Sequence, residues 1–157
     1  MRVGIGYDIH PFEPGRPLVL GGIRIPDEPG LSGHSDADVL THAVIDALLG
    51  AAALGDIGRR FPSDDPQYRD ANSLDLLRQT VRMLAEAGHG IQNLDCTVIA
   101  ERPRVAPHAE AMRSALAEAL GVEVASVSVK ATTANGLGAI GRGEGIAALA
   151  IALLDST

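Results

Sequence analysis

The chain has 157 residues, 46% of them hydrophobic, which is enough apolar material for a single domain spanning residues 1–157 with its own core. Its formal net charge is −7 with 13 Lys and Arg, and it has two Phe, two Tyr and no Trp, so we expect no nucleic-acid binding. Its apolar runs are shorter than the roughly 20 residues of a membrane span, and the start MRVGIGYDIH carries no basic-then-apolar leader, so we expect a cytoplasmic protein without membrane contacts.

The first two predicted elements are a strand and a hairpin. Within residues 3–10, apolar residues alternate with glycine and polar residues, which is the period of a half-buried strand. The same period places Asp8 and His10 on one side of this strand. Within residues 18–25, the dipeptide Gly21-Gly22 divides two apolar runs and accepts the backbone angles of a two-residue turn, so we predict a β-hairpin there.

Residues 33–58 are predicted to form the central helix of the chain, because apolar residues recur along them at helical spacing. Its N-terminal end carries His34, Ser35, Asp36 and Asp38. These short polar side chains either cap the helix or bind an anion together with its free backbone N–H groups. Both interpretations are open at this point.

A polar stripe is predicted along the exposed face of this helix. Asp38, His42 and Asp46 are four residues apart, so a carboxylate lies one turn before and one turn after His42. The helix is expected to end in Gly55–Gly58, a turn in which Asp56 stands between glycines and can approach a ligand closely.

The remaining segments alternate between loops, helices and strands. Residues 61–70 are polar with two prolines and predict an exposed loop that is placed to act as a lid. The apolar tail 146–154 fits a buried helix or a central strand, and its shortness favours the strand. These elements together predict an α+β fold, a mixed sheet with helices packed on it. The other expected elements are a helix from Asn72 or Ser73 to Gly88, a strand over 94–100 with Cys96 buried, a helix from Pro107 to Gly121 and a strand over 126–131.

Asp8 and His10 form a D-x-H pair that offers two metal ligands on one side of a strand. His42 is the best third ligand, and three protein ligands leave a tetrahedral zinc ion with one open position, as in catalytic sites. In the alternative, Asp8 and His10 are solvated residues at a strand end and His42 is a hydrogen-bonded core histidine. The ligand types favour the metal site, whereas the spacing permits both interpretations.

Two polar segments near the C-terminus also have two interpretations each. Thr132 and Thr133 follow a strand, either as an ordinary strand-to-turn transition or as part of a binding site. Within Gly141–Gly145, Arg142 and Glu144 form either a surface pair of little energetic value or, between three glycines, a more closely packed site.

The motifs GYDIH, GHSDADVLTHAVIDALLGAAALGDIG, FPSDD, KATT and GRGEG occur in this order within residues 4–145. Together they resemble the 2-C-methyl-D-erythritol 2,4-cyclodiphosphate synthase family of the non-mevalonate isoprenoid pathway, and the combination is far more specific than any single motif. The resemblance implies a small mixed β-sheet with helices packed on one face. It also implies a homotrimer that has a central cavity and active sites between adjacent subunits.

The resemblance further implies a reaction. In the family, the 2-phosphate of 4-diphosphocytidyl-2-C-methyl-D-erythritol 2-phosphate attacks the β-phosphorus of the diphosphate, which expels CMP and closes a cyclic diphosphate. By analogy, Asp8, His10 and His42 hold Zn²⁺ or another divalent metal, and His34 and Thr133 stabilise the transition state as the catalytic residues. A second cation, Mg²⁺ or Mn²⁺, is implied to bridge the substrate diphosphate.

The substrate contacts are likewise implied by the resemblance. The methylerythritol part is expected against the turn at 56–58 and beneath the loop 61–65, and the cytidine diphosphate part in a pocket built by 100–106 and 132–135 of the neighbouring subunit. The implied substrate-binding residues are Asp8, His10, His34, Ser35, Asp56, Ile57, Gly58, Phe61, Pro62, Ser63, Asp64, Asp65, Ala100, Pro103, Arg104, Val105, Ala106, Thr132, Thr133, Ala134, Asn135, Ala139 and Arg142.

This chain departs from the family pattern at two positions. Asn135 stands where the family usually has an acidic residue that ligates the second cation, and Ala139 stands where it often has a bulky aromatic residue. Asn135 therefore stays in the expected substrate pocket without an assigned metal. The central cavity of the trimer is expected to accept an isoprenoid diphosphate near Arg142.

Two functions from other classes are also compatible with the sequence. A metal-dependent phosphohydrolase would use the same open zinc position to activate water and would release inorganic phosphate. A trimeric binding protein would hold an isoprenoid diphosphate near Arg142 without turnover, and it would keep that property after loss of His42.

Overall fold

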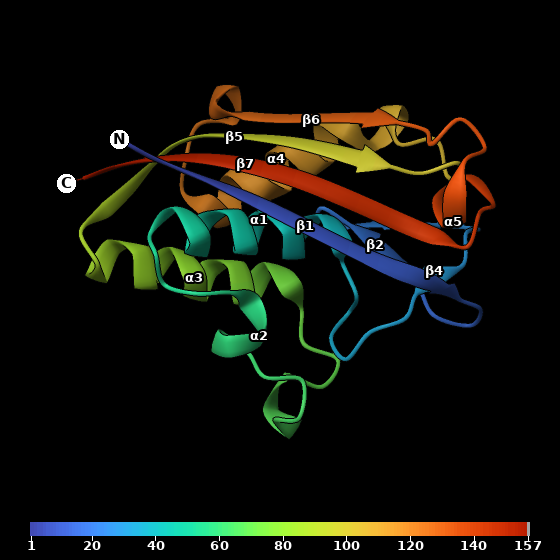
Figure 1. The fold of residues 1–157 in the computed structure, drawn as a ribbon, viewed down its shortest axis with the longest axis horizontal. Helices are drawn as coiled ribbons and strands as arrows, with labels where there is room; N and C mark the ends of the chain where they lie inside the picture. The colour runs from blue at the N-terminus through green and yellow to red at the C-terminus, as the bar shows by residue number, and fades with distance from the viewer. Residues whose placement is uncertain (157) are drawn as a thin grey trace.

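The computed structural model describes residues 1–156, and its largest layer is a five-stranded sheet (Figure 1). Neighbouring strands run antiparallel except β5 and β6, which run parallel, so the sheet is mixed as predicted. A separate hairpin pairs β2 (Leu18–Leu20) with β3 (Ile23–Ile25) around the predicted turn. The order of strands across the sheet is β4 (Gly30–Leu31), β1 (Arg2–Glu13), β7 (Gly145–Ser156), β5 (His89–Ile99) and β6 (Val127–Thr132).

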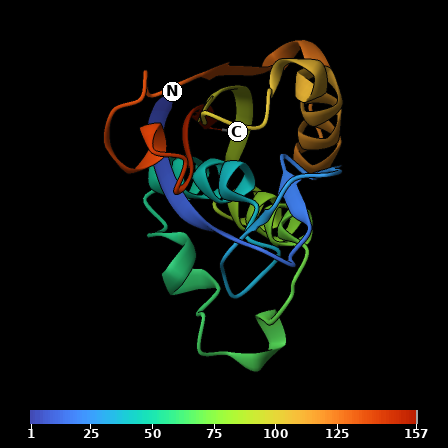
Figure 2. The same cartoon turned by 90° about the vertical axis from the view of Figure 1, so that its right-hand side faces the viewer.

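The long helices α1 (Val39–Ala51), α3 (Ser73–Glu86) and α4 (Ala109–Leu120) lie on one side of the sheet (Figures 1 and 2). Helix α1 packs on β1 and β7, and α4 packs on β6. The α+β class with helices on one face is thus confirmed. The shorter helical segments are α2 (Ile57–Arg60), α5 (Gly138–Gly141) and the 3₁₀ turns η1 (Pro66–Tyr68), η2 (Ala106–His108) and η3 (Val124–Ser126).

Strand β1 has the predicted period of two, and its glycine side, not its apolar side, packs against the helix α1. Its apolar residues Val3 and Ile5 are 69% and 68% exposed. Gly4 and Gly6 face α1, and both are buried. A Cβ atom built on Gly6 would lie 1.9 Å from the backbone oxygen of Ala43, so only glycine allows the strand to lie this close to the helix. The predicted half-buried strand is therefore confirmed, and its buried side is the glycine side.

The predicted polar stripe on α1 is also corrected. Asp38 is the N-cap of α1, and its fully buried carboxylate accepts hydrogen bonds from the backbone N–H groups of Gly21, Gly22 and Thr41 at 2.7 to 3.0 Å. This carboxylate ties the β2–β3 hairpin to the start of α1. It points toward the hairpin turn, because three backbone donors converge there, and does not flank His42.

The C-terminal tail is the strand β7, which lies at the centre of the sheet between β1 and β5. Its residues Ile146, Ala148 and Ala150 pack toward α1 with at most 1% exposure. Helix ends fall at the expected glycines, since Gly88 and Gly121 adopt left-handed φ angles of 76° and 69°. Among residues 1–156, every helix is too short or too polar to cross a membrane.

Candidate metal centre and substrate site

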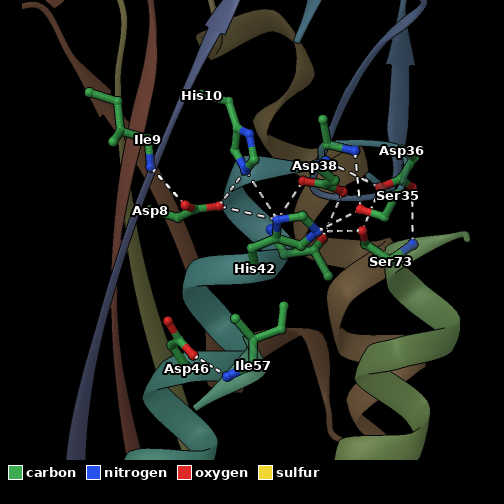
Figure 3. Close-up of polar contacts among 12 residues, drawn as sticks. Asp8, Ile9, His10, Ser35, Asp36, Asp38, His42, Asp46, Ile57 and Ser73 are labelled. Atoms are coloured by element: carbon green, nitrogen blue, oxygen red, sulfur yellow. Dashed lines mark hydrogen bonds and ion pairs between the residues drawn. The ribbon is translucent and has the colours of Figure 1, made fainter. Parts of the chain in front are cut away.

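Asp8, His10 and His42 converge where β1 crosses the start of α1 (Figure 3). His10 Nε2 lies 2.8 Å from Asp8 Oδ2, and His42 Nδ1 lies 3.1 Å from the same oxygen and 3.3 Å from His10 Nε2. The strand period puts Asp8 and His10 on one side of β1, as predicted, and the close approach allowed by Gly6 brings His42 to them. The predicted cluster is therefore assembled within one chain.

The environment of His42 differs from the prediction. We expected it on an exposed face of its helix, but it is only 9% exposed because β1 and the start of α3 cover it. Beyond the cluster, its Nε2 contacts the hydroxyls of Ser35 and Ser73 at 3.1 and 2.9 Å. His42 is thus both a hydrogen-bonded core histidine and a member of the cluster, so the two interpretations of this residue do not exclude each other.

The charges in the cluster favour a bound cation. Burial alone would raise the pKa of Asp8, but the neighbouring imidazoles of His10 and His42 outweigh burial and lower this pKa to about 2. Burial alone would lower the pKa of His10, but the hydrogen bond and the charge of Asp8 outweigh it and raise this pKa. Because Asp8 stays negatively charged and stabilises positive charge beside it, the cluster attracts a proton or a metal ion.

The donor set fits a divalent transition metal. His10 Nδ1 lies 2.6 Å from the carbonyl oxygen of Ser32, which only accepts, so Nδ1 carries a proton and Nε2 is free to ligate once its own proton is lost. One carboxylate oxygen and two imidazole nitrogens within 4.8 Å of one another are ligands that Zn²⁺ prefers. Hydrogen bonds of this kind orient metal-binding histidines. The cluster could therefore hold a divalent metal ion.

A cavity of about 370 Å³ opens beside the cluster and contains many of the predicted contacts. Phe61 closes one wall, where it is 6% exposed and packs edge-on against Tyr68 with ring centroids 5.4 Å apart. The predicted lid is thus anchored by a buried aromatic side chain rather than exposed throughout. The residues that line the cavity are Asp8, His10, His34, Ser35, His42, Ile57, Gly58, Phe61, Pro62, Ser63, Asp64, Tyr68 and Leu76.

His34 lies at the mouth of this cavity on a segment that is held from two sides. Its Nε2 donates to the carbonyl oxygen of Asp65 at 3.2 Å, which links it to the lid. The guanidinium of Arg16 donates to the carbonyl oxygens of Gly33 and Ser35, both at 2.6 Å, so the residues on either side of His34 are fixed. The carboxylate of Asp65 has a different partner, since it accepts from the backbone N–H of Gln67 at 3.0 Å.

The predicted turn after α1 is the start of the short helix α2. Asp56 is its N-cap, and its carboxylate accepts from the backbone N–H of Arg59 at 2.8 Å. Asp46 accepts from the backbone N–H of Ile57 at 2.7 Å, so the second carboxylate of the predicted stripe holds this turn and does not serve His42 (Figure 3). Ile57 and Gly58 line the cavity, whereas Asp56 is exposed and is not among the residues that line it.

Thr133 lies in a different cavity from His34. This second cavity of about 170 Å³ is formed by the loop after β5 and the end of β6. The side chain of Glu101 joins the two segments, since it accepts from the backbone N–H groups of Ala134 and Gly136 at 3.0 and 3.2 Å. The residues that line this cavity are Ala100, Glu101, Pro103, Arg104, Val105, Ala106, Ala131, Thr132 and Thr133.

The remaining predicted residues do not line either of these two cavities. Asn135 adopts a left-handed φ of 53°, and its backbone N–H donates to Thr133 Oγ1 at 3.1 Å. Ala139 lines a third cavity of about 260 Å³ beside the end of β1. Arg142 pairs with Glu144 at 2.9 Å, and both side chains are more than half exposed, so this is the surface pair that the sequence allowed.

Several residues that shape the site were absent from the sequence-based candidates. Arg16, Ser73 and Glu101 each connect segments that are far apart in the chain, and Asp36 was noted only as a possible cap. The sequence predicted Asn72 or Ser73 as the start of α3. The structure has Asn72 as the N-cap, and the Ser73 hydroxyl contacts His42. A contact across 31 residues has no local sequence signal.

Comparison with known proteins identifies the family of this chain. Residues 1–155 match the YgbB family, and the chain is 59% identical to 2-C-methyl-D-erythritol 2,4-cyclodiphosphate synthase from Moorella thermoacetica over 98% of this chain and 94% of that protein. The bifunctional IspDF of Campylobacter jejuni superimposes with a TM-score of 0.96 at 42% identity, over 99% of this chain, which spans 42% of that longer protein. The CDP-bound form of a 2C-methyl-D-erythritol-2,4-cyclodiphosphate synthase superimposes with a TM-score of 0.90 at 36% identity, over 98% of this chain and 100% of that one. The chain therefore belongs to the YgbB family, and the resemblance drawn from its motifs is confirmed.

Proposed function

We propose that this chain converts 4-diphosphocytidyl-2-C-methyl-D-erythritol 2-phosphate to 2-C-methyl-D-erythritol 2,4-cyclodiphosphate with release of CMP. This is a step in the non-mevalonate route to isoprenoid precursors. The observation that carries the proposal is the cluster of Asp8, His10 and His42 beside a cavity, in a chain 59% identical to a synthase of that name. An oxygen of the 2-phosphate bonds to the β-phosphorus, and the bond from that phosphorus to the CMP oxygen breaks.

Catalysis of this step depends on neutralised charge and in-line positioning, because one phosphate anion attacks another and no protein nucleophile is involved. A divalent metal held by Asp8, His10 and His42, which we propose to be zinc, supplies positive charge that neutralises a substrate phosphate. His34 is the proposed transition-state donor in the same cavity, with the Ser35 hydroxyl beside it. The preformed hydrogen bonds of Arg16 hold His34 in place before substrate arrives.

The methylerythritol part is proposed to bind between α2 and the loop 61–65. Asp56 offers carboxylate oxygens to the substrate hydroxyls, and Ile57 and Gly58 line the wall beside it. The loop 61–65 borders the same cavity, and its anchored Phe61 keeps the loop near the reacting phosphates. Exclusion of water there prevents hydrolysis in place of cyclisation.

The complete site is proposed to form between subunits of a homotrimer. Two observations support this arrangement. His34 and Thr133 line separate cavities of one chain, and the outer face of β1 exposes apolar side chains that an interface would cover. A neighbouring subunit would then contribute Thr133 together with residues 100–106 and 132–135 as the cytidine diphosphate pocket, and a relative of this chain binds CDP.

Two further ligands belong to the proposal. Mg²⁺ or Mn²⁺ is proposed to bridge the substrate diphosphate near Asn135, where the amide oxygen offers a neutral ligand in place of a carboxylate. The trimer is proposed to enclose a central cavity that accepts an isoprenoid diphosphate near Arg142, whose guanidinium is exposed beside Glu144. Ala139 leaves more room there than an aromatic residue would.

Phosphorus NMR of the reaction products tests the proposed function. The protein is incubated with 4-diphosphocytidyl-2-C-methyl-D-erythritol 2-phosphate and Mg²⁺, and we expect CMP and a cyclic diphosphate in equal amounts. Inorganic phosphate as the main product would instead identify a phosphohydrolase. Unchanged substrate, with binding of an isoprenoid diphosphate, would identify a binding protein.

A further inference from the structure

The ring of His42 makes polar contacts on both of its nitrogens. Nδ1 faces Asp8 and His10, and Nε2 lies 2.9 Å from Ser73 Oγ (Figure 3). Ser73 is the first residue of α3 and is fully buried. Its hydroxyl also contacts a carboxylate oxygen of Asp36, so a chain of polar groups runs from Asp36 through Ser73 to His42.

The chemistry of these groups fixes the direction of each hydrogen bond. An ionised carboxylate only accepts, so the Ser73 hydroxyl donates its single proton to Asp36. The Ser73 oxygen then presents only lone pairs to the imidazole, and it accepts the N–H of His42 Nε2. Because a neutral imidazole carries one N–H, Nδ1 of His42 is left with the lone pair that points at Asp8 and His10.

Asp36 is held in place by the backbone and does not depend on the Ser73 hydroxyl for its position. Its two carboxylate oxygens accept from the backbone N–H groups of Ser73 and Asp38 at 3.0 and 3.1 Å. Its own backbone N–H donates to the carbonyl oxygen of Ala71 at 3.0 Å. Asp36 therefore stays in position when the hydroxyl alone is removed.

We infer that Ser73 is a positioning residue that holds His42 in the tautomer and orientation needed to ligate a metal through Nδ1, with Asp36 setting the direction of the Ser73 hydroxyl. The inference deepens the proposed function, because it concerns the same metal site. It is independent of the reaction catalysed there, since it predicts properties of the protein without substrate. Partners of this kind typically change metal affinity by roughly 10- to 100-fold when they are removed.

Two neighbouring features separate this role from an ordinary structural one. The N-terminus of α3 is capped by Asn72, whose side-chain oxygen accepts from the backbone N–H of Leu74 at 2.9 Å, so the Ser73 hydroxyl is not needed as a cap. Ser35 also approaches Nε2 of His42, at 3.1 Å, and its oxygen accepts from the backbone N–H of Ala37, but no carboxylate among residues 1–156 contacts the Ser35 hydroxyl to fix the direction of its O–H. Ser73 makes the shorter contact and is the one backed by a carboxylate.

The test measures zinc affinity of the full chain by chelator competition, in the absence of substrate. We expect Ser73→Ala to bind Zn²⁺ about 10- to 100-fold more weakly than the wild type. Nitrogen-15 NMR of the histidine rings in the metal-free protein gives a second readout. The wild type should show neutral His42 protonated at Nε2, and Ser73→Ala should show an increased fraction protonated at Nδ1.

Thr80→Val is the matched control, because Thr80 is a fully buried hydroxyl on the same helix that donates to the carbonyl oxygen of Leu76. Thr80→Val should lose stability without any change in zinc affinity or in the His42 tautomer. Thermal unfolding of each metal-free variant checks that the variant is folded. A zinc affinity of Ser73→Ala within about threefold of the wild type, or an unchanged tautomer, would overturn the inference. If the wild type fails the cyclisation assay but Ser73→Ala still binds zinc more weakly than the wild type, the proposed reaction is rejected and the role of Ser73 stands.

Discussion

Asp8 and Cys96 show how neighbours decide whether a buried group is charged. Burial raises the pKa of both groups, yet the neighbouring imidazoles of His10 and His42 hold the pKa of Asp8 at about 2. Cys96 lies in the core, where burial and the nearby charge of Asp95 raise its pKa to about 12. Asp8 is therefore an ionised carboxylate at neutral pH, and Cys96 is a small apolar side chain, as expected from the sequence.

The sequence predicted residue positions better than residue partners. Asp8 and His10 share one side of β1 because the strand period is a local property. By contrast, Asp38 was expected to flank His42, and it caps the helix and binds the hairpin turn instead. Helical spacing gives the direction of a Cβ atom, but nearby backbone donors decide where a carboxylate finally points.

At Asn135, the expected ligand for the second cation is neutral. Asn135→Asp adds a negative charge at a left-handed position that Asp tolerates, so the backbone should be unchanged. We predict that the Mg²⁺ concentration for half-maximal turnover falls by about three- to tenfold, with zinc content unchanged, because a carboxylate offsets the cost of dehydrating Mg²⁺ better than an amide does. Asn93→Asp, on the exposed part of β5, is the control for added charge. Coincident magnesium titrations of wild type and Asn135→Asp would mean that residue 135 does not contact the second cation.

At the scale of elements, the packing of β1 on α1 builds the candidate metal centre. Gly4 and Gly6 let the strand lie directly on the helix backbone, and Asp8 and His10 continue the same side of the strand toward His42. The alternating pattern of β1 was predicted correctly, but the glycine side is buried and the apolar side is exposed. A period of two cannot tell which side of a strand faces the core when the strand has apolar residues on one side and glycines on the other.

Gly6→Ala tests this pairing. The added Cβ would lie 1.9 Å from the backbone oxygen of Ala43, so strand and helix must separate. We predict a loss of about 3 kcal/mol in the free energy of unfolding, and weaker zinc binding because β1 carries two ligands away from His42. Gly50→Ala is the control, since Gly50 lies in α1 with open space around its Cβ position, and it should be neutral or stabilising by about 0.5–1 kcal/mol. Denaturant titrations measure both, and equal stability of the two variants would contradict the packing argument.

The tail illustrates what the sequence leaves undecided about elements. Residues 146–154 are apolar almost throughout, and such a run fits a buried helix as well as a central strand. In the structure, β7 is flanked by β1 and β5 and covered by α1. The shortness of the run favoured the strand, and the structure confirms this prediction, but the two partner strands are distant in sequence and no local pattern identifies them.

At the scale of the whole molecule, the exposed apolar face of β1 is the feature that points to assembly. We predict that Ile5→Asp, at a side chain 68% exposed in the single chain, converts a trimer into monomers and abolishes turnover, because it places a charge in the proposed interface. Zinc should still bind, since the cluster lies within one chain. Val124→Asp, at an exposed apolar residue of η3, should leave assembly and turnover unchanged. Light scattering and activity measured on the same samples check this, and full activity in a monomer would refute a site shared between subunits.

Metal removal and replacement tests the central claim, that a metal held by Asp8, His10 and His42 drives the cyclisation. We predict that the chelator-treated protein releases no CMP and that about one equivalent of Zn²⁺ per chain restores turnover. His42→Ala should stay folded in the metal-free state, with a loss of about 1–3 kcal/mol because the buried serine contacts are lost, and zinc should not restore its activity. The deciding measurement is CMP release against added zinc for the two proteins. Full turnover of the metal-stripped wild type, or of His42→Ala at wild-type rate, would contradict the account.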